Sequence, residues 1–203
     1  MGPHVIVVPA NEASRQDIAA VFGTRGQAAT CWCQRYKLAR GEAFKHHPPQ
    51  ERAARLRDQT HCDDASAGST SGLVAYLDEE PVGWCAVEPR PAYPGLLRAY
   101  RTPWEGRTED KADPGVWAVT CILVRAGHRR QGIGRALVAA TVDFARGRGA
   151  RALEGYPMRS VPGEEVTWGE EHVGFGDMFA AAGFREVSRP GRRRVVMRID
   201  FDA

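Results

Sequence analysis

The sequence predicts an α+β fold, with helices and strands in mixed order around one sheet. Two apolar segments, 73–77 and 82–87, flank the turn 78–81 and indicate a β-hairpin. Residues 116–124 carry no charge over nine positions, which is typical of a strand buried on both faces. A glycine-rich turn then leads into an amphipathic helix that ends near Gly147. These observations place a buried central strand between a hairpin and a helix.

Local patterns predict the remaining elements. Ser14 and Asp17 form a capping-box pattern that begins a helix, and Gly23 ends it. Strands are expected at 4–9, 152–155, 184–187 and 194–199, and further helices at 50–58 and 177–182. Loops are expected at 62–72, 89–115 and 157–174, which are rich in polar residues, Gly or Pro.

Length and composition exclude several classes of protein. The chain has 203 residues, of which 43% are hydrophobic and 26% charged, so we expect a single domain over residues 1–203 with a sizeable core. No segment approaches the ~20 apolar residues of a membrane-spanning helix, and the N-terminus lacks a secretion-signal pattern. We therefore expect a cytoplasmic protein without a membrane partner. Of the 28 basic residues 25 are Arg, which indicates either GC-rich codon usage or guanidinium groups that face phosphates.

The five cysteines do not predict a disulfide framework, because no export signal precedes them. Cys31 and Cys33 could ligate zinc together with downstream residues, namely His46, His47, His61 and Cys62. A one-residue spacing is strained for two ligands of one ion, however, so we expect no metal. We interpret the segment as a connection between helices in which Trp32 packs and the two thiols line a pocket.

The most informative motif lies between the buried strand and the helix, and reads Arg129-Arg130-Gln131-Gly132-Ile133-Gly134-Arg135. Glycines let the backbone approach a ligand closely, and the N–H groups and dipole of a helix N-terminus bind phosphate or pyrophosphate. A Walker loop is excluded because no Gly-Lys-Ser/Thr follows. A dinucleotide fingerprint would need Gly or Ala at Leu137, although Glu154 stands at the distance of its acidic residue. A plain glycine turn with solvated arginines is the remaining alternative.

The strand Ile122-Leu123-Val124, followed by this turn and helix, resembles motif A of the GCN5-related N-acetyltransferase (GNAT) superfamily. That motif is Arg or Gln, two residues, Gly, one residue, and Gly or Ala. Met178-Phe179 and Gly183-Phe184 resemble the helix and strand that close the fold. The resemblance implies a single GNAT-like domain with a central, mostly antiparallel mixed sheet, splayed fourth and fifth strands, and flanking helices.

The resemblance also implies a co-substrate and a reaction. The chain is expected to transfer an acetyl group from acetyl-CoA to an amine of a small molecule, by direct attack in a ternary complex. In the family, backbone at the positions of Ile122, Leu123 and Val124 pairs with the pantetheine arm. The amides of the turn hold the pyrophosphate, so the expected coenzyme-binding residues continue with Arg129, Arg130, Gln131, Gly132, Ile133, Gly134 and Arg135. A backbone N–H between the splayed strands would polarise the thioester carbonyl.

The residues that transfer protons depart from the family pattern. Many members use a Glu on the fourth strand as base and a Tyr on the last helix as acid. This chain has no carboxylate on that strand, and Phe179 stands at the Tyr position. Glu154, at the end of the fifth strand, is therefore the candidate base, with a salt bridge as its alternative role. Tyr156 and His172 are further catalytic candidates.

The acceptor and the function class have open alternatives. The loop 157–172 contains Glu164, Glu165, Glu170, Glu171 and Trp168 at a position that borders the family's acceptor pocket. Acidic and aromatic groups suit a cationic amine, although these residues can also simply keep a loop soluble. A non-catalytic acyl-CoA sensor and a protein or peptide N-acetyltransferase are the alternative functions. Nucleic acid is not expected as a partner, because 25 acidic residues offset the basic ones. A monomer or a homodimer is compatible with the sequence.

Overall fold

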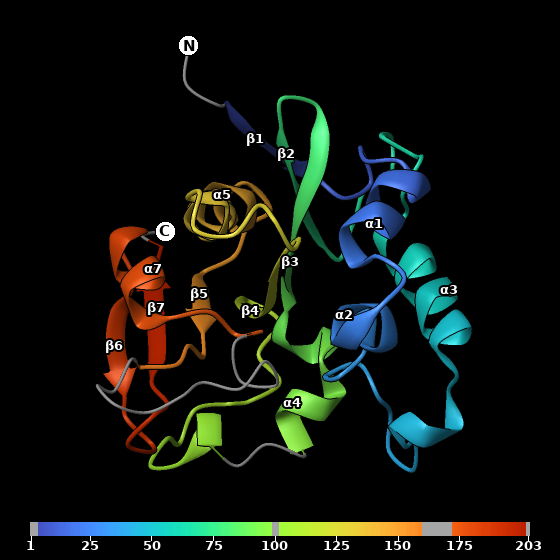
Figure 1. Ribbon diagram of the computed structural model, residues 1–203. Helices are drawn as coiled ribbons and strands as arrows, with labels where there is room; N and C mark the ends of the chain where they lie inside the picture. The colour runs from blue at the N-terminus through green and yellow to red at the C-terminus, as the bar shows by residue number, and fades with distance from the viewer. Residues whose placement is uncertain (1–3, 99–101, 160–171, 202–203) are drawn as a thin grey trace.

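The computed structural model describes residues 4–98, 102–159 and 172–201 (Figure 1). Within them, seven strands form one sheet in the order β1-β2-β3-β4-β5-β7-β6. The strands are β1 (Val5–Pro9), β2 (Gly72–Leu77), β3 (Glu80–Pro89), β4 (Val116–Val124), β5 (Ala152–Gly155), β6 (Arg185–Ser188) and β7 (Val196–Asp200). In this sheet β4 and β5 run parallel, and each other neighbouring pair is antiparallel. The expected mostly antiparallel mixed sheet is thus confirmed.

Helices cover both faces of the sheet (Figure 1). The α-helices are α1 (Arg15–Phe22), α2 (Gly26–Cys31), α3 (Pro49–Thr60), α4 (Pro94–Arg98), α5 (Ile133–Gly147) and α7 (Gly176–Ala181). Short 3₁₀ helices are η1 (Phe44–His46), η2 (Arg90–Ala92) and η3 (Thr102–Trp104). Helices α5 and α7 pack on one face, and α1 to α3 on the other, so each face has its own apolar core. None of the helices in the described residues is long and apolar enough to cross a membrane.

The central strand and the long helix form as their sequence patterns predict. Strand β4 is buried over its first five residues. Helix α5 directs Ile133, Leu137, Val138 and Thr141 into the core. Their spacing of three or four residues places them on one helical face, and burial of each aliphatic side chain contributes about 1.5–3 kcal/mol. This packing fixes the start of α5 beside the end of β4.

The N-terminal helix and the hairpin also agree with the sequence, with small differences. Ser14 accepts a hydrogen bond from the N–H of Asp17, and the Asp17 carboxylate accepts one from the N–H of Ser14, which completes the capping box. In the hairpin Asp78 and Glu79 have positive φ angles of 46° and 72°. A two-residue turn with positive φ at both positions joins two antiparallel strands without splaying them. Strand β3 therefore begins at Glu80, two residues before the expected start of the strand at residue 82.

The connection expected to be irregular over 89–115 contains η2, α4 and η3, and helix α2 was likewise not predicted. These helices have three to six residues, too few for an apolar periodicity to show in the sequence. Tertiary contacts hold them instead. The Nε1 of Trp104 donates to the carbonyl of Leu96 at 3.0 Å, and the guanidinium of Arg90 is fully buried.

Strands β4 and β5 pair from Val116 with Ala152 to Val119 with Gly155, and then separate. Residues 172–175 lie between the separated ends. The N–H of Ile122 donates to the carbonyl of His172 at 2.6 Å, and the N–H of Met158 donates to the carbonyl of Gly174 at 2.9 Å. Gly174 has a φ of 72°, and a Cβ there would lie 2.7 Å from Cδ1 of Ile122. Glycine at this position permits both the positive φ and the close approach to Ile122.

Candidate active site

A cavity of about 260 Å³ lies along the open end of β4, and we call it the β4 cavity. On one side it is lined by Ile122, Leu123 and Val124 from the strand and by Arg129, Arg130 and Gly134 from the turn and α5. Its opposite wall comes from α1, α2 and the following turn and comprises Phe22, Ala28, Cys31 and Cys33. The inner end is formed by Tyr36 and His172. The cavity therefore has lining residues from the start of α5, from the end of β4 and from the helices on the opposite side.

A neighbouring cavity of about 350 Å³, the α5 cavity, surrounds the N-terminus of the helix and is lined by Gly132, Ile133, Gly134 and Arg135. Nine of the ten sequence-predicted coenzyme residues line one of these two cavities. The exception is Gln131, whose Nε2 donates to the carbonyl of Gly127 at 3.1 Å. The predicted residues thus form one continuous surface along β4 and α5.

The turn before α5 has the chemistry of an anion site. Gly132 is the N-cap of α5 and has a φ of 82°. Because glycine has no side chain, it caps none of the N–H groups in the first turn of the helix. Arg129 and Arg130 are exposed beside them and add positive charge. A Cβ on Gly134 would lie 2.6 Å from Cε of Met178, so glycine keeps this wall open. These residues fit the diphosphate of a coenzyme.

The Cys31-Trp32-Cys33 segment is a strained turn. Trp32 and Cys33 have φ angles of 47° and 56°, a conformation that costs on the order of 1–3 kcal/mol per residue. Packing maintains it, because Trp32 stacks on Phe22 with ring centroids 4.8 Å apart, and Nε1 of Trp84 donates to Sγ of Cys33 at 3.1 Å. The turn directs both thiols to the β4 cavity, as the sequence interpretation expected.

Two cysteine thiols of this region, those of Cys121 and Cys31, have pKa values above the ordinary value of a thiol. A hydrogen bond with Cys33 and burial raise the pKa of Cys121 well above its ordinary value. Burial, followed by the nearby Cys33, raises the pKa of Cys31. Because a thiolate rather than a thiol is the nucleophile, neither group is prepared to attack a thioester. The thiols serve as small apolar wall groups. In the described parts of the chain, no group of three or more His, Cys, Asp or Glu side chains is arranged to hold a metal ion.

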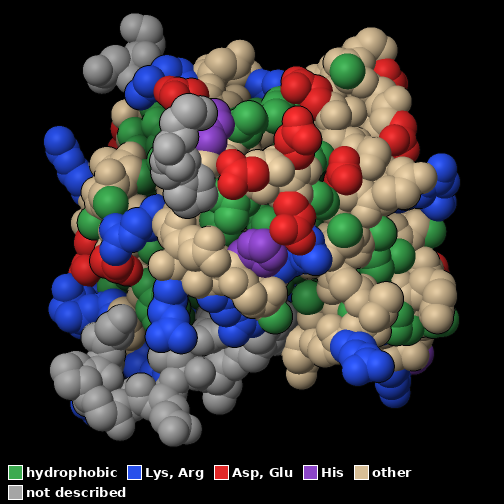
Figure 2. All heavy atoms as spheres, turned by 45° about the horizontal axis from the view of Figure 1, so that its top comes forward, with side chains coloured by type: hydrophobic (Ala, Val, Ile, Leu, Met, Phe, Trp, Pro, Cys, Tyr) green, Lys and Arg blue, Asp and Glu red, His purple; other side chains and the backbone are tan. Residues whose placement is uncertain are grey.

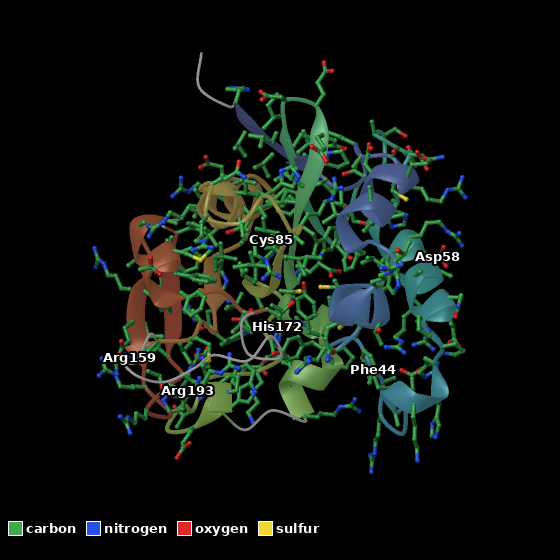
Figure 3. All side chains as sticks on the ribbon, viewed as in Figure 1. Phe44, Asp58, Cys85, Arg159, His172 and Arg193 are labelled. Atoms are coloured by element: carbon green, nitrogen blue, oxygen red, sulfur yellow. The ribbon has the colours of Figure 1, made fainter. Side chains whose placement is uncertain are left out.

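Tyr36 and His172, together with Arg35, line both the β4 cavity and a third cavity of about 230 Å³, which we call the β7 cavity. The Tyr36 hydroxyl lies 3.3 Å from Nε2 of His172, and the two residues are 7% and 8% exposed. Their backbones are anchored, since the carbonyl of Tyr36 accepts the N–H of Gly95 at 2.8 Å and that of His172 accepts the N–H of Ile122. Figure 3 places His172 near the middle of the molecule, with Arg193 toward β6 and Phe44 on the other side. A hydrogen-bonded pair of titratable groups therefore stands where two cavities meet.

Glu154 lies apart from this meeting point. Its carboxylate is fully buried and accepts hydrogen bonds from Arg107, from Arg198 at 2.8 Å and from the Tyr156 hydroxyl at 3.2 Å. It is not among the residues that line the β4 or the β7 cavity. Ion pairs with three arginines and a place outside both cavities favour the salt-bridge alternative for Glu154.

The two other catalytic candidates differ in their surroundings. Tyr156 lines the β7 cavity, but burial and the adjacent Glu154 raise its pKa well above the ordinary value, which makes it a weak acid. His172 lines both cavities. Sequence reasoning did not select Tyr36, because nothing in the local pattern links it to a residue 136 positions away. The loop residues that were expected to border the acceptor pocket lie outside the described residues. They are Glu164, Glu165, Glu170, Glu171 and Trp168.

Acidic and basic side chains share the face shown in Figure 2, which is viewed partly from the top of Figure 1. Asp and Glu gather at its centre and upper right, while Lys and Arg lie mostly along its left side and lower edge. A nucleic-acid surface would instead present a continuous basic stripe. The coloured side chains of this face, which belong to described residues, form no such stripe.

The chain matches the Acetyltransferase (GNAT) family over residues 32–156. Among solved structures it is similar to a GCN5-related N-acetyltransferase from Kribbella flavida, at 15% identity over 97% of this chain and 98% of that chain, with a TM-score of 0.51. It is also similar to yncA from Salmonella typhimurium, solved with its cofactor acetyl-CoA, at 14% identity over 98% and 94% of the two chains, with a TM-score of 0.53. A GNAT-family structure from Desulfovibrio desulfuricans matches at 20% identity over 97% and 99%, with a TM-score of 0.51.

At these identities the solved structures establish the fold. A search of curated proteins found no match. The family match covers more than half of the sequence. It agrees with the end of β4 that does not pair with β5 and with the glycine turn before α5. The protein has the fold of an acetyltransferase. It belongs to the GNAT acetyltransferase family.

Proposed function

We propose that the protein is an N-acetyltransferase that transfers the acetyl group of acetyl-CoA to an amine of a small molecule. The observation that carries this proposal is the meeting of the β4 and β7 cavities at Tyr36 and His172. A donor in one cavity and an acceptor in the other would face each other across a pair of groups able to move protons. Direct transfer in a ternary complex requires such an arrangement.

Acetyl-CoA would lie along the β4 and α5 cavities, and it supplies an acetyl group activated as a thioester. Arg129 and Arg130, with the first-turn amides of α5, would hold its diphosphate. The end of β4 would hold the pantetheine arm. The Ile122 N–H already donates to the carbonyl of His172, so pairing at that amide requires the carbonyl to withdraw. Leu123 and Val124 extend beyond this contact.

The reaction forms a bond between the amine nitrogen and the acetyl carbonyl carbon while the carbon–sulfur bond breaks. In our proposal His172 accepts the proton that the amine loses. The Tyr36 hydroxyl gives a proton to the departing sulfur, and the imidazolium then returns its proton to the tyrosinate across their 3.3 Å contact. The products are an acetamide and the CoA thiol, and both side chains regain their starting protonation.

A covalent route through a cysteine is disfavoured by the raised pKa of Cys121 and of Cys31. A protonated thiol is a weak nucleophile. Arg35 lies near Cys31 and lowers its pKa, but burial of the thiol outweighs this effect. Acetylated enzyme should therefore be undetectable by mass analysis after incubation with acetyl-CoA alone.

An acceptor screen tests the proposal. Purified protein is incubated with acetyl-CoA and a broad panel of amines and short peptides, and thiol release is followed with mass analysis of each product. We expect one CoA released per acetylated small-molecule amine. A coenzyme sensor would bind acetyl-CoA, with a measurable dissociation constant, yet release no thiol with any acceptor. Turnover restricted to peptides would contradict the small-molecule assignment.

A further inference from the structure

Tyr36 lies in a segment of irregular backbone, and tertiary contacts must hold it beside His172. Between α2 and η1, residues 32–43 form neither a helix nor a strand. A helix or a strand fixes its register through a repeating ladder of backbone hydrogen bonds, and this segment has no such ladder. Side-chain contacts therefore determine which of its residues faces the β4 and β7 cavities. The inference drawn from these contacts rests on the function proposed above.

Side chains that precede Tyr36 attach the segment at two points. The Sγ of Cys33 accepts the hydrogen bond from Trp84 on β3 that was described above. The amides of Gln34 and Gln59 bond to each other in both directions, because Nε2 of Gln34 donates to Oε1 of Gln59 at 2.9 Å and Nε2 of Gln59 donates to Oε1 of Gln34 at 3.3 Å. The segment is thus joined to the sheet and to α3 before it reaches Tyr36.

The residue directly after Tyr36 attaches the segment to the sheet again. The ammonium of Lys37 forms an ion pair with the carboxylate of Glu88 on β3, and the two side chains are only 9% and 15% exposed. The Nζ of Lys37 also lies 4.6 Å from the ring centroid of Tyr93. Tyr93 belongs to the same buried cluster as Tyr36 and Ala118, and Ala118 pairs with Glu88 across β3 and β4. The ion pair therefore lies beside the packing that surrounds Tyr36.

A largely buried ion pair selects one arrangement of the chain more than it stabilises the fold. Both charges lose their hydration, so the net gain in stability is small, but a shifted segment would leave a charge buried without its partner. Burial raises the pKa of Glu88, and the charge of Lys37 opposes this effect. A shift of one residue along the segment would move Lys37 from Glu88 and Tyr36 from His172 at the same time.

We propose that Lys37 and Glu88 are positioning residues for Tyr36. Their ion pair holds the segment in the register at which the Tyr36 hydroxyl contacts His172. Neither Lys37 nor Glu88 is among the residues that line the β4 or the β7 cavity, so the pair acts through Tyr36 and not on the substrates. The proton transfer from Tyr36 to the departing sulfur then depends on this pair.

Variants of the ion pair test the proposal. Lys37→Met keeps an unbranched side chain and removes the charge, and it should lower kcat by about tenfold while the KM for acetyl-CoA stays unchanged. Glu88→Gln should have a similar effect, and the combined variant should be no slower than the slower single variant, because the two residues act as one unit. Arg55→Met is the control, since it breaks the Arg55–Glu42 ion pair outside both cavities. It should retain kcat.

A double-mutant cycle with Tyr36→Phe separates positioning from a general loss of stability. If Lys37 acts through the Tyr36 hydroxyl, the variant with both Lys37→Met and Tyr36→Phe should be about 100-fold slower than the wild type, which is the loss expected for Tyr36→Phe alone. Independent effects would instead multiply to about 1,000-fold. A multiplicative result, or wild-type kcat in Lys37→Met, would overturn the inference.

A second measurement uses the free enzyme and no substrate. In protein labelled with a nitrogen isotope in its histidine rings, the His172 resonances are assigned through their loss in His172→Gln. Lys37→Met should shift these resonances as Tyr36→Phe does, and Arg55→Met should leave them in place. If Lys37→Met changes neither kcat nor the resonances, the inference fails and the acetyltransferase proposal stands. If no amine is acetylated, the proposed function fails, and the resonances still decide whether the ion pair positions Tyr36.

Discussion

The hydroxyl of Tyr36 lies 3.3 Å from Nε2 of His172, although 136 residues separate them in the chain. Tyr36 follows the strained Cys31-Trp32-Cys33 turn, and His172 is held by Ile122 at the edge of β4. Both residues line the β4 cavity and the β7 cavity. In our proposal this pair transfers the protons for which the family resemblance implies a Glu on the fourth strand and a Tyr on the last helix.

Tyr36→Phe should lower kcat by about 100-fold, because it removes the hydroxyl and keeps the ring that lines both cavities. The KM for acetyl-CoA should remain unchanged. His172→Gln should cause a similar loss and also remove one limb of the pH profile of kcat/KM. Tyr76→Phe is the matched control, since its hydroxyl donates to Asp17 at 3.0 Å in a different region. A Tyr36→Phe enzyme with wild-type kcat would exclude the pair from the chemistry.

Replacing both Arg129 and Arg130 with Gln should raise the KM for acetyl-CoA by about tenfold, equivalent to about 1.4 kcal/mol. Both side chains are exposed at the start of α5, so their attraction for a diphosphate weakens as salt screens it. The difference between the variant and the wild type should accordingly shrink as ionic strength rises. Arg146→Gln, at the opposite end of α5, should leave the KM unchanged. An equal effect from Arg146 would indicate a nonspecific charge effect.

Glu154→Gln should lower the free energy of unfolding by about 3–5 kcal/mol, because it leaves the buried guanidinium of Arg90 and those of Arg107 and Arg198 without their central carboxylate. Denaturant titration measures this loss. The folded variant should retain kcat, whereas loss of a general base would cost about 10²–10⁴-fold. Glu105→Gln, an exposed change on the same connection, should be neutral in both measurements. A large loss of kcat with intact stability would restore Glu154 as the base.

Glu42 should contribute to stability in a pH-dependent manner. A hydrogen bond from Arg55 and one from the N–H of Ala39 lower the pKa of Glu42 from 4.5 to about 2. Since the folded-state pKa is below the unfolded one, the stabilisation is complete above pH 4.5 and is lost as the pH falls toward 2. Melting temperatures of the wild type and Glu42→Gln should therefore differ at pH 7 and converge at low pH. In an Arg55→Gln background the effect of Glu42→Gln should be much smaller; an unchanged effect would contradict the role of Arg55.

Much of the scaffold could be predicted from the sequence. The nine uncharged residues of β4, the one-sided apolar spacing of α5 and the capping box of α1 each depend on neighbours within a few positions. The glycine turn before α5 predicts an anion site in the same way, because the dipole and the amides of one helix end would create it. Short elements such as α2, α4 and η2 carry too little periodicity to be predicted in this way.

The sequence by itself thus predicted the central strands, the long helix and the glycine turn before that helix, since local patterns specify them, whereas the arrangement of the sheet was expected from the family resemblance. Tertiary structure decided which groups share a site. It surrounds Glu154 with arginines from η2, from the connection after η3 and from β7, and it brings Tyr36 to His172. Partners so far apart along the chain meet only when both faces of the sheet are packed and β4 and β5 separate around residues 172–175. Such meetings depend on the folded packing, which no local pattern encodes.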